Sequence, residues 1–119
     1  MNGQFMAKLT LILQNSVKEH TQSMNALAFA KAAITTGHTI ACVFFYRESV
    51  NHAEFPTPAE NEDLITQWEE FSQQNHVPLV VCHTVAERKG MEKFHPGFEA
   101  SGLTALATAM ANSDRTLQF

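Results

Sequence analysis

Cysteine is scarce in this chain, with two residues among 119. Two cysteines cannot build the disulfide framework of a small secreted domain, and a tetrathiolate zinc site needs four. No Cys-x-x-Cys motif of a redox pair is present. The role of each cysteine therefore has to be argued from its own position.

Basic side chains are also few, and long apolar runs are missing. Eight lysines and arginines stand against twelve acidic residues, a net charge of −4 that argues against broad nucleic-acid binding. No run approaches the roughly 18 apolar residues that span a bilayer. The opening MNGQFMAKLTLIL lacks a basic leader and a small-residue cleavage site, so it does not resemble a signal peptide. We expect a cytoplasmic protein with reduced thiols.

Acidic side chains gather in one segment. Residues 48–70 carry no lysine or arginine and seven acidic residues: Glu48, Glu54, Glu60, Glu62, Asp63, Glu69 and Glu70. This block predicts a solvated face, and a docking surface for a basic partner is the alternative.

Strand and helix patterns alternate along the first half of the chain. Residues 7–13 (AKLTLIL) and 38–46 (HTIACVFFY) predict two strands, the second apolar on both faces as a covered parallel sheet requires. The alanine-rich segment between them predicts a helix that ends at Gly37. Its apolar stripe comprises Met24, Leu27, Ala28 and Ile34. Residues 51–59, with two prolines, predict a loop, and the inner face of the next helix comprises Leu64, Ile65, Trp68 and Phe71.

The second half continues the alternation. Residues 77–82 (VPLVVC) predict a third strand, and residues 84–89 predict a short helix that ends at Gly90. Residues 91–100 predict a loop, and residues 116–119 predict a terminal strand. The stripe of the last helix comprises Leu103, Leu106, Ala107 and Met110. The whole pattern predicts an α/β fold with a doubly wound, mainly parallel sheet, in a single domain over residues 1–119. The first and last helices carry almost no charge, which predicts an oligomer interface.

Cys82 lies where open parallel sheets gather their functional groups, at the end of a strand and directly before a helix. A thiol there is close to the positive end of the helix dipole, which favours the thiolate, and Arg88 adds positive charge. The alternative is a small buried hydrophobic side chain. Cys42 lies mid-strand among apolar residues, so we expect it to be inert core packing.

Three other side chains are candidates for supporting roles at this cysteine. His83 follows Cys82, but adjacent residues on an extended chain point to opposite faces, so we expect His83 to face solvent or a partner. Arg88 lies one to two turns further on. Ser101 precedes Gly102 at the start of the last helix and is first a helix cap.

Metal and nucleotide sites are disfavoured. The six histidines show no i, i+4 pair and no neighbouring pair of cysteines, which argues against zinc. The segment after the first strand, QNSVKEHTQ, contains no glycine, which argues against a phosphate-binding loop and a flavodoxin-type nucleotide or flavin site.

Three segments carry a family resemblance. They resemble the DsrE/TusD-like sulfur-relay family. The first is the second predicted strand with the residues that follow it, GH-x-x-x-x-VFFYRESV. The others are the cysteine segment CHTVAERKG and the C-terminal SGLTALATAMANSDRTLQF. The likeness extends from the first strand to the last residue. It implies a flavodoxin-like three-layer αβα fold and a sulfurtransferase that carries a persulfide on Cys82. Persulfide exchange through a thiolate needs neither metal nor organic cofactor.

The resemblance also implies partners. Two paralogous subunits of the same fold, TusB-like and TusC-like, would complete a heterohexamer, an upstream carrier would supply sulfur, and a downstream acceptor would deliver it toward 2-thiouridine at the tRNA wobble position. No direct contact with nucleic acid or membrane is implied. The sequence leaves open a sulfur-oxidation relay, a non-catalytic subunit of the same fold and a homo-oligomer in the absence of partners.

Overall fold

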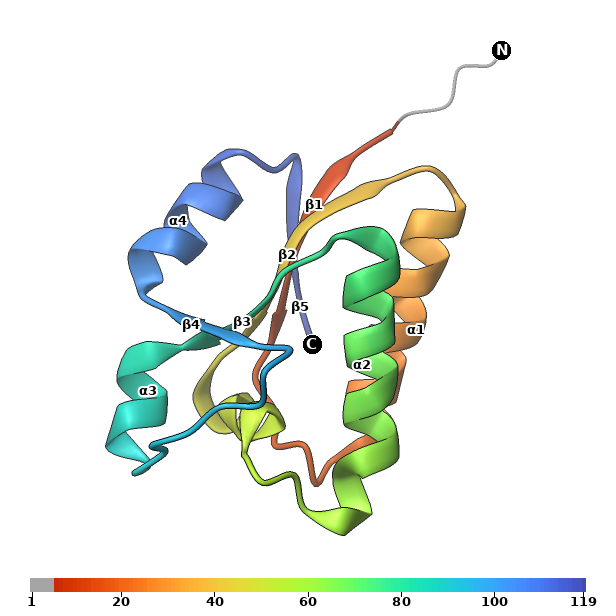
Figure 1. Ribbon diagram of the computed structural model, residues 1–119. Helices are drawn as coiled ribbons and strands as arrows, with labels where there is room; N and C mark the ends of the chain where they lie inside the picture. The colour runs from red at the N-terminus through yellow and green to blue at the C-terminus, as the bar shows by residue number, and fades with distance from the viewer. Residues whose placement is uncertain (1–5) are drawn as a thin grey trace.

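A parallel sheet of five strands forms the centre of the computed structural model, which describes residues 6–119 (Figure 1). The strands are β1 (Lys8–Leu13), β2 (Thr39–Phe45), β3 (Leu79–Cys82), β4 (Glu99–Ser101) and β5 (Arg115–Gln118), in the order β4-β3-β2-β1-β5. Every pairing is parallel. Residues 1–5 of the opening segment lie outside the described residues.

Helices cover both faces of this sheet. α1 (His20–Thr35) and α2 (Glu62–Asn75) lie side by side on one face, and α4 (Leu103–Ala111) lies on the other, with the short α3 (His83–Arg88) on the same side (Figure 1). Right-handed crossovers explain why α1 and α2 share one face and α4 lies on the other, because the chain steps in one direction from β1 through β2 to β3 and returns from β4 past β1 to β5. The predicted three-layer α/β fold is confirmed. Within residues 6–119, no helix has the length and hydropathy needed to cross a membrane.

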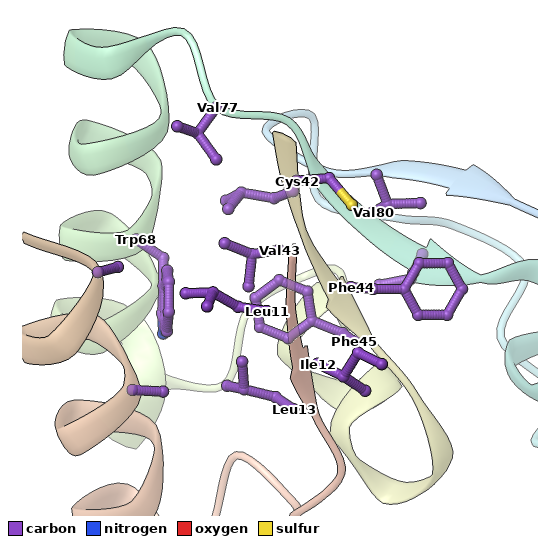
Figure 2. Packing of buried hydrophobic residues seen from close by; sticks show 14 of the residues in the cluster. Leu11, Ile12, Leu13, Cys42, Val43, Phe44, Phe45, Trp68, Val77 and Val80 are labelled. Atoms are coloured by element: carbon purple, nitrogen blue, oxygen red, sulfur yellow. The ribbon is translucent and has the colours of Figure 1, made fainter. Parts of the chain in front are cut away.

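The core between the sheet and α2 follows the predicted pattern. Leu11, Val43 and Phe45 point toward Trp68 of α2, whereas Phe44 and Val80 point to the opposite face (Figure 2). Phe45 and Trp68 meet edge to face at 5.5 Å between ring centroids. The whole predicted inner face of α2 is buried: Leu64, Ile65, Trp68 and Phe71. Six of the seven acidic residues of the 48–70 block are exposed, so this block is a solvated face.

The predicted stripe of α1 is wrong at two positions. Met24 is 52% exposed and Ala28 is also exposed. The buried residues are instead Ser23, Ala26, Leu27, Ala30 and Ala33. Small side chains allow the helix axis to approach the sheet and α2 closely, and a long methionine would hold it away. The prediction was right at Leu27, which is buried, and at Ile34, which packs against the core, and wrong at Met24 and Ala28.

Three further expectations need correction. Residues 51–53 of the predicted loop belong to the 3₁₀ helix η1 (Arg47–Ala53), and a second short 3₁₀ helix, η2 (Ala59–Asn61), precedes α2. The predicted loop over 91–100 contains the start of β4, an edge strand with no apolar alternation in its residues. In the stripe of α4 only Leu106 is buried, because no other element of residues 6–119 covers the outer side of this helix: Leu103 is 50% and Met110 41% exposed.

A buried histidine joins α1, η1 and α2. His52 is 1% exposed, and its Nδ1–H donates to the Ser49 carbonyl at 2.8 Å. Its Nε2 accepts from the Ser23 hydroxyl at 2.8 Å, and that hydroxyl accepts from the Trp68 indole N–H at 2.9 Å. Burial, opposed by the Ser49 bond and aided by His20, lowers the pKa of His52 from 6.5 to about 4. The imidazole is therefore neutral in this network.

This network predicts acid sensitivity. The unfolded chain binds a proton at His52 below about pH 6.5, whereas the folded chain does not until about pH 4, so stability falls as pH drops through this window. Between pH 7 and pH 5 the loss from this group is about 2 kcal/mol. Urea unfolding at several pH values measures it. His52→Gln should be less stable at pH 7 and lack this part of the pH dependence, and an equal slope in both proteins would contradict the assignment.

Candidate functional site

Cys82 occupies the position that the sequence predicted. It is the last residue of β3 and the N-cap of α3, at the edge where the parallel strands end (Figure 1). The strand is buried along its whole length, and Gly90, at a positive φ of 76°, follows the end of the helix. The apolar run therefore defines the strand that ends at Cys82, and Gly90 limits the following helix to one short segment, so the thiol lies at a strand-to-helix turn.

Ser101 lies beside Cys82 for a reason that the sequence did not show. β3 pairs with β4, and Cys82 is in register with Ser101. Register partners of a parallel pair project to the same face of the sheet. The expected capping role of Ser101 is wrong, because Gly102 is the N-cap of α4 and no side chain caps that helix. Ser101 ends an edge strand instead, and no periodicity in residues 91–100 signals that strand.

His83 and Arg88 mark the two ends of α3. The side chain of His83 is 57% exposed, and its Nε2 lies 3.3 Å from the Glu87 carboxylate one turn further on. This contact directs the imidazole along the outside of the helix, as expected for a residue facing solvent or a partner. Arg88, the last residue of α3, is exposed and contributes to a cavity at the same edge of the sheet.

The Cys82 side chain is covered, being 1% exposed. Nucleophilic exchange requires access to the sulfur atom. The helix that directly follows Cys82 is weakly anchored, since α3 has six residues and only Ala86 among them is buried. Segments with so few buried contacts open locally at low cost in free energy.

Cys42 has the environment of a packing residue. It lies in the middle of β2 and is 7% exposed. Burial raises the pKa of the Cys42 thiol to about 11, with a smaller contribution from the Glu99 carboxylate. Its sulfur points to the same face as Val80 (Figure 2). The predicted place of Cys42 in the core is confirmed, and its low reactivity stays a prediction.

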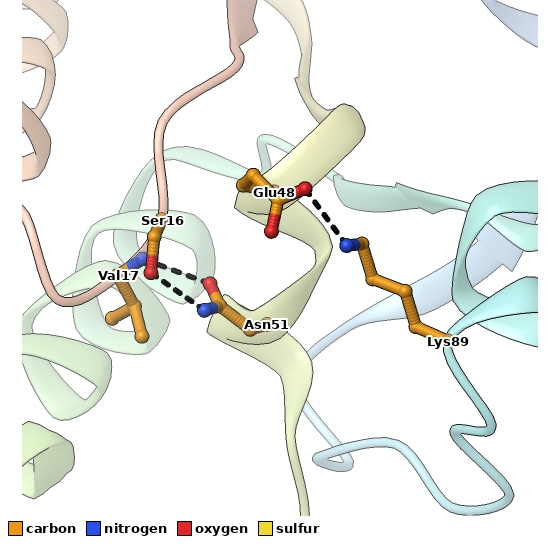
Figure 3. A network of polar contacts seen from close by, with 5 residues as sticks. All are labelled: Ser16, Val17, Glu48, Asn51 and Lys89. Atoms are coloured by element: carbon orange, nitrogen blue, oxygen red, sulfur yellow. Dashed lines mark hydrogen bonds and ion pairs between the residues drawn. The ribbon is translucent and has the colours of Figure 1, made fainter.

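The chain segment after β2 makes contacts that the sequence reasoning did not predict. Glu48 of η1 accepts from the Lys89 ammonium at 2.8 Å, joining η1 to the end of α3 (Figure 3). The Asn51 side chain accepts from the Val17 N–H at 2.8 Å and donates to the Ser16 hydroxyl at 2.7 Å. η1 therefore connects the loop after β1 with α3. The sequence feature that could have indicated these residues is the polar run Tyr46-Arg47-Glu48 directly after the buried end of β2.

Histidine, cysteine and carboxylate side chains do not gather around a common point in the part of the chain described here. Among residues 6–119, no three such side chains form a group that could hold a metal ion. The His20 Nε2–H donates to the Asn61 Oδ1 at 2.8 Å, and the His95 Nδ1 accepts from the Gly97 N–H at 3.0 Å. These histidines serve local hydrogen bonds.

Comparison with known proteins points to one family. The model of the DsrE/DsrF-like family matches residues 7–119. A protein named sulfurtransferase TusD from Cronobacter sakazakii is 36% identical and aligned over 94% of this chain and 99% of its own length. Those of the same name from Sodalis glossinidius and Salmonella paratyphi B are 38% and 40% identical, each over 82% of this chain.

A solved structure shares the fold. The ychN protein from E. coli superposes with a TM-score of 0.76 and covers 96% of this chain and 100% of its own length, at 21% identity. This likeness supports the three-layer architecture. At that identity it says nothing further about chemistry.

Proposed function

The chain belongs to the DsrE/DsrF-like family, and from this membership we propose that it is a sulfurtransferase of a sulfur relay that carries a persulfide on Cys82. The observation that carries the proposal is the position of Cys82. Of the two cysteines, it is the one at a strand-to-helix turn on the carboxyl edge of the sheet. The relatives that match most of the chain are named as sulfurtransferases, which supports the same activity.

The proposed reaction is thiolate exchange on sulfane sulfur. The Cys82 thiolate attacks the outer sulfur of a donor persulfide, the S–S bond of the donor breaks, and the donor cysteine leaves as a thiolate. The proton of the outer sulfur remains on it, and Cys82 becomes a persulfide. An acceptor thiolate then attacks that outer sulfur and restores Cys82. No net oxidation occurs, so the step needs neither metal nor organic cofactor.

Access to Cys82 follows from displacement of α3. We propose that a docking donor moves this helix, because only Ala86 of its side chains is buried and its outer end is held by the exposed Glu48–Lys89 ion pair. Ser101, in register with Cys82, supplies a hydroxyl beside the thiol. His83 and Arg88 lie at the two ends of the helix that moves. They are positioned to contact the donor protein.

The proposed partners follow the family. We propose two paralogous subunits, TusB-like and TusC-like, in a heterohexamer, with an upstream carrier and a downstream acceptor that leads to wobble-uridine 2-thiolation of tRNA in the cytoplasm. Exposed apolar side chains on the outer faces of α1 and α4 support an assembled form: Met24, Phe29, Leu103 and Met110. A relay of sulfur oxidation uses the same exchange chemistry and differs in the final acceptor.

A second candidate is a non-catalytic subunit of the same fold. The specific observation in its favour is the 1% exposure of Cys82. If α3 did not open in the native chain, Cys82 would be packing like Cys42, and the chain would serve its partners as a scaffold.

Timed alkylation separates the two candidates. In the native chain we expect iodoacetamide to modify Cys82 at least about tenfold faster than Cys42, because local opening of α3 exposes one thiol and only global unfolding exposes the other. Mass analysis of the two peptides, with Cys42→Ser and Cys82→Ser chains as references, measures both rates. Equal rates at the pace of global unfolding would favour the scaffold.

A further inference from the structure

A cavity of about 740 Å³ opens at the carboxyl edge of the sheet. Its walls come from the loop after β1, from residues 46–48 that follow β2, and from the second half of α3 with Lys89. Cys82 does not line it, but Val85, three residues further along α3, does. Open α/β sheets bind ligands at this edge. The volume lies in the range of small-molecule sites, about 300–1,000 Å³.

Positive charge is concentrated in this cavity although the chain as a whole is acidic. Three of the eight lysines and arginines line it, Arg47, Arg88 and Lys89, in a chain of net charge −4. Glu48, the one carboxylate in the lining, is engaged by Lys89 at 2.8 Å. Within residues 6–119, neither Arg47 nor Arg88 forms an ion pair. The cavity therefore holds two guanidinium groups with no anionic partner.

Arg47 is held in place by an unusual backbone. Its φ of 53° lies in the left-handed region, which costs a non-glycine residue about 1–2 kcal/mol. Among residues 6–119, His76 is the second non-glycine residue with positive φ, and it is a helix C-cap, where this conformation is common. Arg47 is not a helix C-cap, so its positive φ has no explanation of this kind. Its guanidinium carbon lies over the ring of Tyr46, another lining residue, at 5.7 Å from the ring centroid. Backbone strain of this kind recurs at ligand sites.

Neutral donors complete the lining. Two of the lining residues carry neutral donor groups: Asn15 in the loop after β1 and Tyr46 directly after β2. The loop is fixed on η1 by Asn51, so Asn15 is presented from an anchored segment (Figure 3). Planar guanidinium groups with amide and hydroxyl donors suit a tetrahedral oxyanion.

From these observations we propose that the cavity binds a tetrahedral oxyanion, either free or as the head group of a small molecule, with Arg47 and Arg88 as its charged ligands. This inference goes beyond the proposed function, because anion binding does not require sulfur on Cys82. Sulfate and phosphate share the chemistry that the cavity recognises. The ratio of the affinities for sulfate and phosphate distinguishes a cavity for a sulfur oxyanion from a cavity for a phosphate-bearing ligand.

The test is a titration of the full ¹⁵N-labelled chain with sodium sulfate and, separately, sodium phosphate, at ionic strength held constant with sodium chloride. Saturable shifts are expected at residues 14–15, 46–48 and 85–89. Arg88→Gln and Arg47→Gln should each weaken binding about tenfold, the effect of one charge-assisted hydrogen bond. The matched control is Arg115→Gln, which removes the same charge at the first residue of β5 and should leave the affinity unchanged.

Three results would overturn the proposal. They are shifts that do not saturate with either anion, an equal loss of affinity in Arg115→Gln, and unchanged affinity in either Arg47→Gln or Arg88→Gln. Far-UV circular dichroism of each variant establishes that it is folded. Loading of Cys82 from a persulfide donor, measured on the same variants, reports separately on the sulfur-transfer proposal.

Discussion

Replacing Cys82 with serine is expected to abolish the sulfur-carrying form of the chain. After incubation with a cysteine desulfurase, cysteine and a sulfur-carrier protein, the unmodified chain should gain about 32 Da, the mass of one sulfur atom on a thiolate. Serine has nearly the same volume but no nucleophilic thiolate at neutral pH, so the mass of Cys82→Ser should not change. Intact-mass spectrometry under non-reducing conditions measures the gain directly.

Cys42→Ser is the matched control for this experiment. It removes the other thiol, whose pKa burial raises to about 11, and should keep the full gain of mass. A gain that persists in Cys82→Ser, or one that disappears in Cys42→Ser, would contradict the assignment of the persulfide to Cys82. Treatment with a reductant should remove the added sulfur, because a persulfide is reducible and a sulfinic acid of equal nominal mass is not.

Replacing Trp68 with alanine is expected to cost about 4 kcal/mol of unfolding free energy. Trp68 is 0% exposed and packs edge to face on Phe45 and Phe71, at 5.5 and 6.2 Å between centroids. Its indole N–H also donates to Ser23 at 2.9 Å. Domains of this size are stable by about 5–15 kcal/mol, so the variant should lose much of its stability. Urea unfolding followed by far-UV circular dichroism measures the change, since the variant has no tryptophan to report.

The control is Met24→Ala on the outer side of α1. Met24 is 52% exposed, and its removal should change stability by no more than about 0.5 kcal/mol. The intermediate variant Trp68→Phe keeps an aromatic ring and loses only the hydrogen bond and part of the volume, so its cost should lie between the two. A Trp68→Ala midpoint equal to that of Met24→Ala would show that α2 does not close the core as described.

The strands and their order of appearance were largely predictable because their residues carry local signals. Residues 7–13, 38–46 and 77–82 are aliphatic and β-branched, and each contains an observed strand. The inner face of α2 was predictable because its large side chains repeat at helical spacing and all are buried. α1 was not, because it buries Ser23 and three alanines, and small side chains carry no hydrophobic signal. β4 also lacked a hydrophobic signal, because this edge strand is held by pairing of its backbone with β3 and not by burial of apolar side chains.

The site divides in a similar way. The place of Cys82 at a strand-to-helix turn follows from an apolar run and a glycine that stops the helix. Its neighbours do not follow from the sequence, because Ser101 reaches it by strand register and Arg47 reaches the same edge through a backbone turn at positive φ. The spacing of the six histidines in the sequence did not single out His52, whose burial lowers its pKa to about 4.

The small number of cysteines, known from the sequence by itself, limited the kinds of site that the chain can hold. With two thiols in 119 residues, a disulfide scaffold and a tetrathiolate zinc site were excluded, and local patterns separated a mid-strand cysteine from one before a helix. Only the tertiary structure decided that Cys82 is covered, that Ser101 lies in register with it and that two arginines share a cavity nearby. The physical reason is range: hydrophobic spacing and turn residues act over a few positions, whereas burial and register depend on segments far apart in the chain.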